Sequence, residues 1–144
     1  MIYFDTSFIA PLFIAEPASE SVEAYVLRLE PEELATSVWA QVELASLVSR
    51  KVRMGEFSES EGQSVRRELD RVLGESFDLL LPGAADFADA ARYLGIRNTG
   101  LRAGDALHLA IAANRGARKI LTLDEGLLKI ARSLKLPISR GIRK

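Results

Sequence analysis

The sequence predicts an α/β fold: a three-layer α/β/α sandwich around a small parallel sheet of four to five strands. Short apolar runs alternate along the chain with longer segments whose apolar residues recur every three or four positions. The first run is continuously apolar up to Asp5, as strands covered by helices on both faces are. With 144 residues, 48% of them hydrophobic, the chain can bury one sizeable core, so we expect a single domain over residues 1–144.

Two strands and four helices are expected in the first half of the chain. The strands should span residues 2–5 and 34–36, and the helices residues 7–13, 19–30, 37–55 and 58–74. Ser19 is a typical N-cap of the second helix, and Gly55 can close the third in a left-handed conformation. Ser58 with Glu61 forms a capping box that opens the fourth. The third and fourth helices should therefore pair as an antiparallel hairpin.

The second half repeats the alternation. Strands are expected at residues 77–81 and 119–123, with a short edge strand at 137–139, and helices at 84–94, 102–114 and 124–134. No internal repeat or low-complexity tract interrupts this order. Strands separated by helices favour parallel pairing through right-handed crossovers.

Composition excludes several classes of protein and site. The absence of cysteine excludes disulfides, thiolate metal sites and a cysteine nucleophile, and a single histidine argues against a multi-histidine metal site. The formal net charge is −1, but 14 of the 19 basic residues are arginine, the side chain that binds phosphate bidentately. No apolar stretch approaches the roughly 20 residues of a membrane span, and the N-terminus does not resemble a signal peptide. We expect a cytoplasmic protein without membrane contact.

Two aspartates stand where predicted strands end. Asp5 follows the first apolar run, and Asp124 follows the run "KILTL". In open parallel sheets, ligands bind beyond the carboxyl ends of the strands, where strand order reverses. Each aspartate has a structural alternative, because an acid between a strand and a helix also serves as an N-cap.

Two further acids lie in predicted helices. Glu43 has no cation three or four residues away, and its neighbours are largely apolar, although Arg50 two turns along is a possible partner. Asp105 falls near the start of an apolar helix, where capping or the helix dipole could also explain it. His108, one turn later, could orient Asp105 or a phosphate, but packing or surface exposure is the more ordinary role of such a residue.

Taken as a set, these acids indicate a metal centre. Carboxylates of Asp5, Glu43, Asp105 and Asp124 converging at one sheet edge could not all stay ionised unaided. Mg²⁺ or Mn²⁺ prefers oxygen ligands and would resolve the repulsion. Such a centre can hold a phosphodiester and activate water.

The segments "YFDTSF", "TSVWAQVELASLV", "GDALHLAIA" and "ILTLDEGL", in this order, resemble the PIN-domain ribonucleases, and the VapC toxins of toxin–antitoxin pairs in particular. The resemblance implies a PIN-like fold and a Mg²⁺- or Mn²⁺-dependent endoribonuclease that leaves 5′-phosphate and 3′-hydroxyl ends. The four acidic positions of the family match Asp5, Glu43, Asp105 and Asp124. Thr6 and Thr122 match small polar residues that help to hold the acids, water or phosphate.

The same resemblance implies an RNA substrate, a homodimer and a cognate VapB-like antitoxin, with much of the antitoxin contact expected on the hairpin over residues 38–73. Basic residues near the acids should bind RNA phosphates, which position a substrate without choosing its sequence. The candidates are Arg50, Lys51, Arg53, Arg97, Arg102, Arg115, Arg118 and Lys119.

Three other kinds of protein could carry acids at these positions. A receiver-like phosphoacceptor domain needs adjacent acids after the first strand and an aspartate after the third, whereas Asp5 is followed by Thr6 and the third run ends "LLLPG". A phosphatase of the Asp-x-Asp kind is disfavoured because residue seven is serine. A catalytically silent binding module remains, and the presence of all four acids counts against it.

Overall fold

Five short parallel strands form one sheet in a computed structural model that describes residues 1–97 and 100–143. The sheet order is β3-β2-β1-β4-β5. The strands are β1 (Ile2–Phe4), β2 (Leu34–Ser37), β3 (Asp78–Leu80), β4 (Lys119–Leu121) and β5 (Ile138–Ser139). The predicted parallel sheet is confirmed, including its short edge strand.

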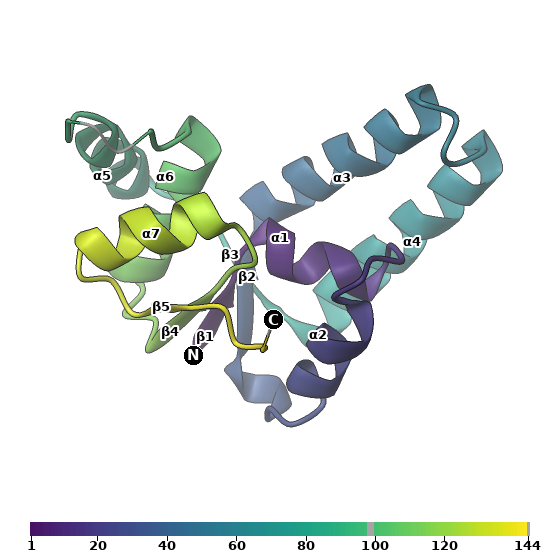
Figure 1. The fold of residues 1–144 in the computed structure, drawn as a ribbon, viewed down its shortest axis with the longest axis horizontal. Coiled ribbons are helices and arrows are strands. Elements are labelled where there is room, and N and C mark those ends of the chain that lie inside the picture. The colour runs from purple at the N-terminus through teal and green to yellow at the C-terminus, as the bar shows by residue number, and fades with distance from the viewer. Residues whose placement is uncertain (98–99, 144) are drawn as a thin grey trace.

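Helices cover both faces of the sheet, which completes the predicted sandwich. They are α1 (Thr6–Ile9), α2 (Ser19–Val26), α3 (Val38–Arg53), α4 (Glu59–Ser76), α5 (Ala84–Leu94), α6 (Ala103–Asn114) and α7 (Glu125–Ser133), with short 3₁₀ turns at Ala10–Leu12 and Pro31–Glu33. Figure 1 shows α3 and α4 projecting as a long antiparallel hairpin, while α5, α6 and α7 gather on the other side of the strands. Within the described residues, no helix is long and apolar enough to cross a bilayer.

The central strand β1 divides its side chains between two cores. Ile2 and Phe4 pack into the core shared with α1 to α4, and Tyr3 packs into the core shared with α5, α6 and α7. Successive side chains of a strand point to opposite faces, so a continuously apolar strand must serve both layers. Tyr3, the one residue of β1 with a polar group in its side chain, thus points toward the layer that contains α6.

The two largest differences from the expected helix bounds lie upstream of Pro11 and Pro31, and the other helices agree with expectation to within two residues. The first helix, expected over residues 7–13, is α-helical only to Ile9 and continues as a 3₁₀ turn, since Pro11 has no N–H to donate. The second, expected to reach residue 30, ends at Val26. Glu30 is extended (φ −72°, ψ 140°), the conformation favoured before a proline such as Pro31.

The hairpin ends as its sequence indicates. Ser58 accepts a hydrogen bond from the Glu61 backbone N–H and Glu61 bonds back to the Ser58 N–H, which forms the predicted capping box. Gly55 after α3 has φ +73°, as expected for a left-handed helix closure. The two helices therefore form a hairpin whose connection is fixed by these caps.

Strand order places a crevice beside β1. The chain moves from β1 outward through β2 to β3, then returns to place β4 on the opposite side of β1. Asp5 and Thr122 each follow one of these two neighbouring strands directly. Because ligands bind where strand order reverses, a site is expected at the ends of β1 and β4.

Candidate functional site

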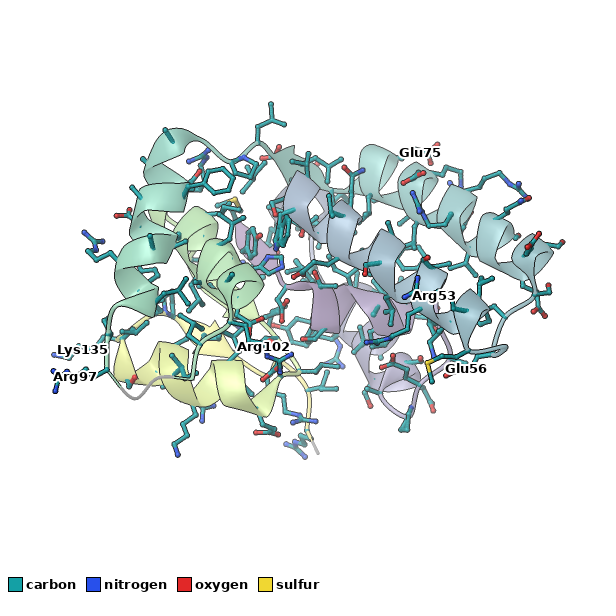
Figure 2. The ribbon with its side chains drawn as sticks, turned by 90° about the horizontal axis from the view of Figure 1, so that it is seen from above. Arg53, Glu56, Glu75, Arg97, Arg102 and Lys135 are labelled. Carbon is teal, nitrogen blue, oxygen red and sulfur yellow. The ribbon has the colours of Figure 1, made fainter. Side chains whose placement is uncertain are left out.

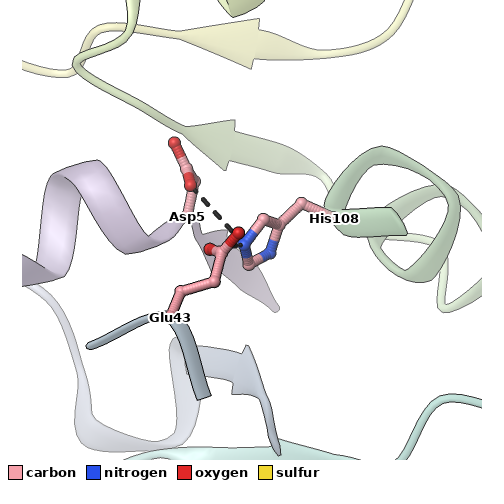
Figure 3. A group of neighbouring side chains, drawn as sticks. All are labelled: Asp5, Glu43 and His108. Atoms are coloured by element: carbon pink, nitrogen blue, oxygen red, sulfur yellow. Dashed lines mark hydrogen bonds and ion pairs between the residues drawn. The ribbon is translucent and has the colours of Figure 1, made fainter. Parts of the chain in front are cut away.

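A cavity of about 490 Å³ opens at this point, and all four acids singled out in the sequence line it. Asp5 comes from the end of β1, Glu43 from α3, and Asp105 and Asp124 from the starts of α6 and α7. Figure 3 shows Asp5, Glu43 and His108 converging from β1, α3 and α6. The lining residues are Asp5, Thr6, Ser7, Ala10, Glu16, Glu43, Ser46, Leu47, Arg50, Arg102, Asp105, Leu123 and Asp124.

Asp5 is buried and held by hydroxyl groups. It occupies the N-cap position of α1, but its side chain makes no capping bond to that helix. Its Oδ2 instead accepts hydrogen bonds from Ser7 Oγ (2.7 Å) and from Thr122 Oγ1. The capping alternative for Asp5 therefore does not explain where its carboxylate points.

Glu43 is half-buried, and His108 is the basic group beside it. His108 Nε2 lies 2.7 Å from Glu43 Oε2 and 3.7 Å from Asp5 Oδ1, and Thr6 donates to the same Glu43 oxygen. Arg50 lines the cavity, but the basic partner of Glu43 is this histidine, 65 residues away in sequence, and not Arg50, the possible partner in the sequence. His108 is fully buried, so it packs inside the protein and also belongs to the site.

The charges of this pair favour each other. Burial opposes ionisation of Glu43, but hydrogen bonding and attraction to His108 outweigh it and lower the glutamate pKa. Burial also opposes the charged form of His108, which by itself would lower the pKa of the histidine. The hydrogen bond to Glu43 and the charges of Asp5, Glu43 and Asp105 outweigh burial and raise this pKa. The inner part of the cavity thus holds an ionised glutamate next to a histidine that is readily protonated.

Close helix packing fixes the other oxygen of Glu43. A Cβ added to Gly104 of α6 would lie 2.5 Å from Glu43 Oε1 and 3.3 Å from Trp39 Nε1. Within the described residues the buried Trp39 N–H makes no hydrogen bond of ordinary geometry, yet it lies close enough to help lower the pKa of Glu43. Glycine at position 104 therefore allows α6 to approach the acid directly.

Asp105 and Asp124 form the outer part of the cavity. Asp124 Oδ1 accepts the backbone N–H of Leu127 (2.9 Å), so this acid does cap α7 while lining the cavity. Burial and the charges of Asp5 and Asp124 raise the pKa of Asp105 to about 6. Arg102 lies 4.0 Å from each of Asp105 and Asp124 and offsets only part of this repulsion.

The donor set fits a hard divalent cation. Asp5, Glu43 and His108 bring one potential ligand atom each to within 4.8 Å of one another, and because His108 Nε2 already bonds Glu43, the two carboxylates are the groups free to bind the ion. Asp105 and Asp124 add carboxylates on the same cavity, and the raised pKa of Asp105 shows that the protein leaves negative charge there without full compensation. Oxygen donors with surplus negative charge are what Mg²⁺ and Mn²⁺ bind.

Most of the basic residues proposed to hold phosphate serve other parts of the fold. Arg50 and Arg102 line the cavity, and Figure 2 shows Arg102 between α6 and α7, well apart from Arg97. Five others bond elsewhere: Lys51 to Glu56, Arg53 to Ser49, Arg115 to Asp86, Arg118 to Glu33 and Lys119 to Tyr25.

Sequence reasoning did not single out Tyr3 or Ser37. The Tyr3 hydroxyl bonds His108 Nδ1, on the side of the ring away from Glu43, and donates to Ser37 Oγ. A tyrosine inside a buried strand looks like an ordinary core residue. No sequence spacing links it to a histidine 105 residues later.

Comparison with known proteins agrees with this architecture. A family model described as PIN domain matches residues 2–133. Ribonuclease VapC47 of Mycobacterium tuberculosis (strain CDC 1551 / Oshkosh) is 32% identical to this chain over 138 residues, which cover 93% of this chain and 92% of the relative.

Solved structures show the same fold at lower identity. The crystal structure of FitAcB from Neisseria gonorrhoeae has a TM-score of 0.79 at 20% identity, with 98% of each chain covered. The structure of FitAB bound to an IR36 DNA fragment gives 0.77 at 18% identity, covering 100% of this chain and 97% of that one. The Mycobacterium tuberculosis VapC20, described as a sarcin-ricin loop cleaving toxin, gives 0.71 at 17% identity over 88% of this chain and 92% of its own.

The raised pKa of Asp105 predicts how the stability of the metal-free protein depends on pH. Because the folded state binds this proton more tightly than the unfolded state, its contribution stabilises the protein at pH 4 and is lost as pH rises through about 6. We expect Asp105→Asn to raise the free energy of unfolding at pH 7 by about 1 kcal/mol, a value discounted for solvent screening, and to have little effect at pH 4. Urea unfolding in EDTA at both pH values measures this, with the exposed Asp70→Asn as control; an equal effect at both pH values would contradict it.

Proposed function

This chain is a VapC-like member of the PIN domain family, and we propose that it is a metal-dependent endoribonuclease that cleaves RNA to 5′-phosphate and 3′-hydroxyl ends. We propose further that this single PIN-like domain acts in the cytoplasm as the toxin of a VapBC-type toxin–antitoxin pair. One observation carries the proposal: four carboxylates from separate elements line one cavity beside the central strand. A silent binding module would not need Asp105 held beside two acids that raise its pKa.

In this proposal Asp5, Glu43, Asp105 and Asp124 hold Mg²⁺ or Mn²⁺. The bound ion supplies Lewis acidity toward the scissile phosphate and lowers the pKa of water. Thr122 and Ser7 fix the Asp5 carboxylate by donating to Oδ2, and Thr6 fixes Glu43 by donating to Oε2. These hydroxyls keep the acids oriented before any ligand arrives.

The RNA backbone would enter past Arg50 and Arg102, the arginines on the cavity wall. Arg102 is largely exposed and spans Asp105 and Asp124 at 4.0 Å, a distance at which water screens the pairs strongly. Its guanidinium can therefore leave the acids for a phosphate at little cost. Contacts of this kind hold the backbone and leave base choice to other surfaces.

The nuclease assignment predicts a specific loss. Asp5→Asn should abolish Mn²⁺-dependent cleavage of a mixed cellular RNA pool, with a loss of at least about 100-fold, because a ligand and its place in the hydroxyl network change together. End mapping should find 5′-phosphates at the cuts, and EDTA should stop the reaction. Asp70→Asn on the exposed face of α4 is the matched control and should cleave normally. Cleavage that survives Asp5→Asn would remove the basis of the assignment.

A second cavity, of about 730 Å³, supports an antitoxin partner. It lies between α2 and α4, and its walls are apolar, with Leu12, Phe13, Val26, Leu27 and Val72 among them. Glu23, Glu68 and Glu75 also line it. An amphipathic segment with basic residues flanking its apolar side would fit this groove, as in helix-in-groove recognition. The groove includes α4 of the hairpin on which antitoxin contact is expected.

Leu27 offers a test of this groove because it lines the cavity and is 78% exposed, so it has little structural role of its own. Leu27→Asp should weaken binding of a cognate VapB-like antitoxin by at least about tenfold, while nuclease activity stays intact. Leu81→Asp, a change at a leucine 71% exposed outside the groove, is the control. Isothermal titration of both variants decides, and equal affinity for Leu27→Asp and the unchanged protein would place the partner elsewhere.

The proposal also includes a homodimer. Phe87 and Leu94 lie seven residues apart on α5 and are 57% and 40% exposed, which leaves an apolar stripe along one side of this helix. A second copy covering the stripe would give a particle of twice 15.8 kDa. Phe87→Lys should shift the sedimentation mass to the monomer, whereas Met54→Lys at the hairpin tip should not. A dimer unaffected by Phe87→Lys would require another interface.

A further inference from the structure

We propose that Tyr3 and His108 are positioning residues that fix the carboxylate of Glu43 through a buried chain of hydrogen bonds starting at Ser37. The proposal deepens the function proposed above and rests on it, because Glu43 is taken as a metal ligand. It assigns roles to side chains that do not line the cavity. The chain joins β2, β1, α6 and α3, which are the elements around the inner end of the site.

The geometry of the chain is continuous. The Tyr3 hydroxyl donates to Ser37 Oγ (2.9 Å) and lies 2.7 Å from His108 Nδ1. The opposite nitrogen of the ring, Nε2, lies 2.7 Å from Glu43 Oε2. With the Tyr3 proton given to Ser37, the tyrosine oxygen is left to accept from Nδ1–H, and Nε2–H donates to Glu43. Every bond in the chain then has one donor and one acceptor.

The chain is sealed from solvent. Tyr3, Ser37 and His108 are each 0% exposed. Buried polar groups are expensive unless paired, and removing one partner leaves the next one unsatisfied. Tyr3, Ser37 and His108 are therefore constrained to one arrangement.

The Ser37 hydroxyl takes part in the hydrogen-bond chain and does not cap the helix that it precedes. Ser37 is the N-cap residue of α3, a position where serine ordinarily bonds the helix backbone, but its side chain makes no capping bond. The hydroxyl accepts from Tyr3 instead. The start of the helix that carries Glu43 is thus tied to the central strand by the same chain that reaches the Glu43 carboxylate.

The chain leaves Glu43 little freedom. Oε2 receives hydrogen bonds from Thr6 and from His108, while Oε1 is pressed against Gly104 and Trp39. Rotating the carboxylate would break the first pair of contacts or clash with the second. Partners behind a metal ligand commonly set its orientation, and their loss costs about 10- to 100-fold in metal affinity.

Mn²⁺ affinity measured by calorimetry on the full-length protein tests the proposal. Tyr3→Phe keeps the ring and removes the hydroxyl, and should weaken Mn²⁺ binding about tenfold; His108→Leu should weaken it about 10- to 100-fold. His108→Gln, whose side-chain NH₂ can still donate to Glu43, should restore most of the affinity lost with leucine. Tyr25→Phe removes a hydroxyl outside the site and should bind normally. Unchanged Mn²⁺ affinity in a folded Tyr3→Phe protein would overturn the proposal.

A double-mutant cycle separates positioning from simple packing. If Tyr3 acts through Glu43, Tyr3→Phe should change Mn²⁺ affinity less than twofold in a Glu43→Gln background. A packing defect would give the same loss in both backgrounds, and that additivity would refute the positioning role. Melting temperatures of the same variants verify that each protein is folded.

A metal-free readout distinguishes failure of this inference from failure of the proposed function. The protein has 1 histidine, so its imidazole ¹⁵N signals need no assignment. Tyr3→Phe should move mainly the Nδ1 shift and Glu43→Gln mainly the Nε2 shift. If the unmutated protein bound no Mn²⁺ while these shifts moved as stated, the metal assignment would fall and the hydrogen-bond chain would stand. Shifts insensitive to Tyr3→Phe would eliminate the chain itself.

Discussion

Repulsion between carboxylates gathered at the ends of β1 and β4 is the constraint on which the rest of the site depends. Each acid is stabilised by a different device: hydroxyls on Asp5, a buried histidine and Thr6 on Glu43, and a helix N-terminus on Asp124. Asp105 is stabilised by the exposed Arg102 4.0 Å away and by the charge of His108, but these do not offset burial and the neighbouring acids, and its pKa rises to about 6. The charge that the protein leaves uncompensated is thus concentrated at the mouth of the cavity, where a cation can reach it.

The sheet supplies the framework for this arrangement. Because β1 is central and buried on both faces, its alternate side chains reach both helical layers, and Tyr3 carries a hydroxyl into the layer of α6. One strand therefore ends in an acid and also holds the histidine behind another acid. This double use explains how a strand of only 3 residues can organise side chains from both helical layers.

The same distribution of charge would limit how the proposed RNA substrate is held. Arg50 and Arg102 face the cavity, while several other arginines and lysines pair with acids or backbone elsewhere in the fold. Two arginines would bind mainly the phosphates of the backbone. Selection of a base sequence would then depend on the shape of the groove or on a second subunit. The apolar groove between α2 and α4 is separate from this site in its lining residues, so an inhibitor could anchor there without competing for the four acids.

The sequence by itself determined the fold class, the order of the elements and the four acids, because apolar periodicity, helix caps and acids after strands are local signals. It could not determine that Glu43 meets His108 rather than Arg50, or that the Asp5 side chain leaves its capping position. Nor could it reveal the link between Tyr3 and His108. These were decided by the tertiary structure, since strand order and helix packing bring together residues 65 and 105 positions apart. Burial then makes such contacts strong, because a polar group without water must find its partner within the fold.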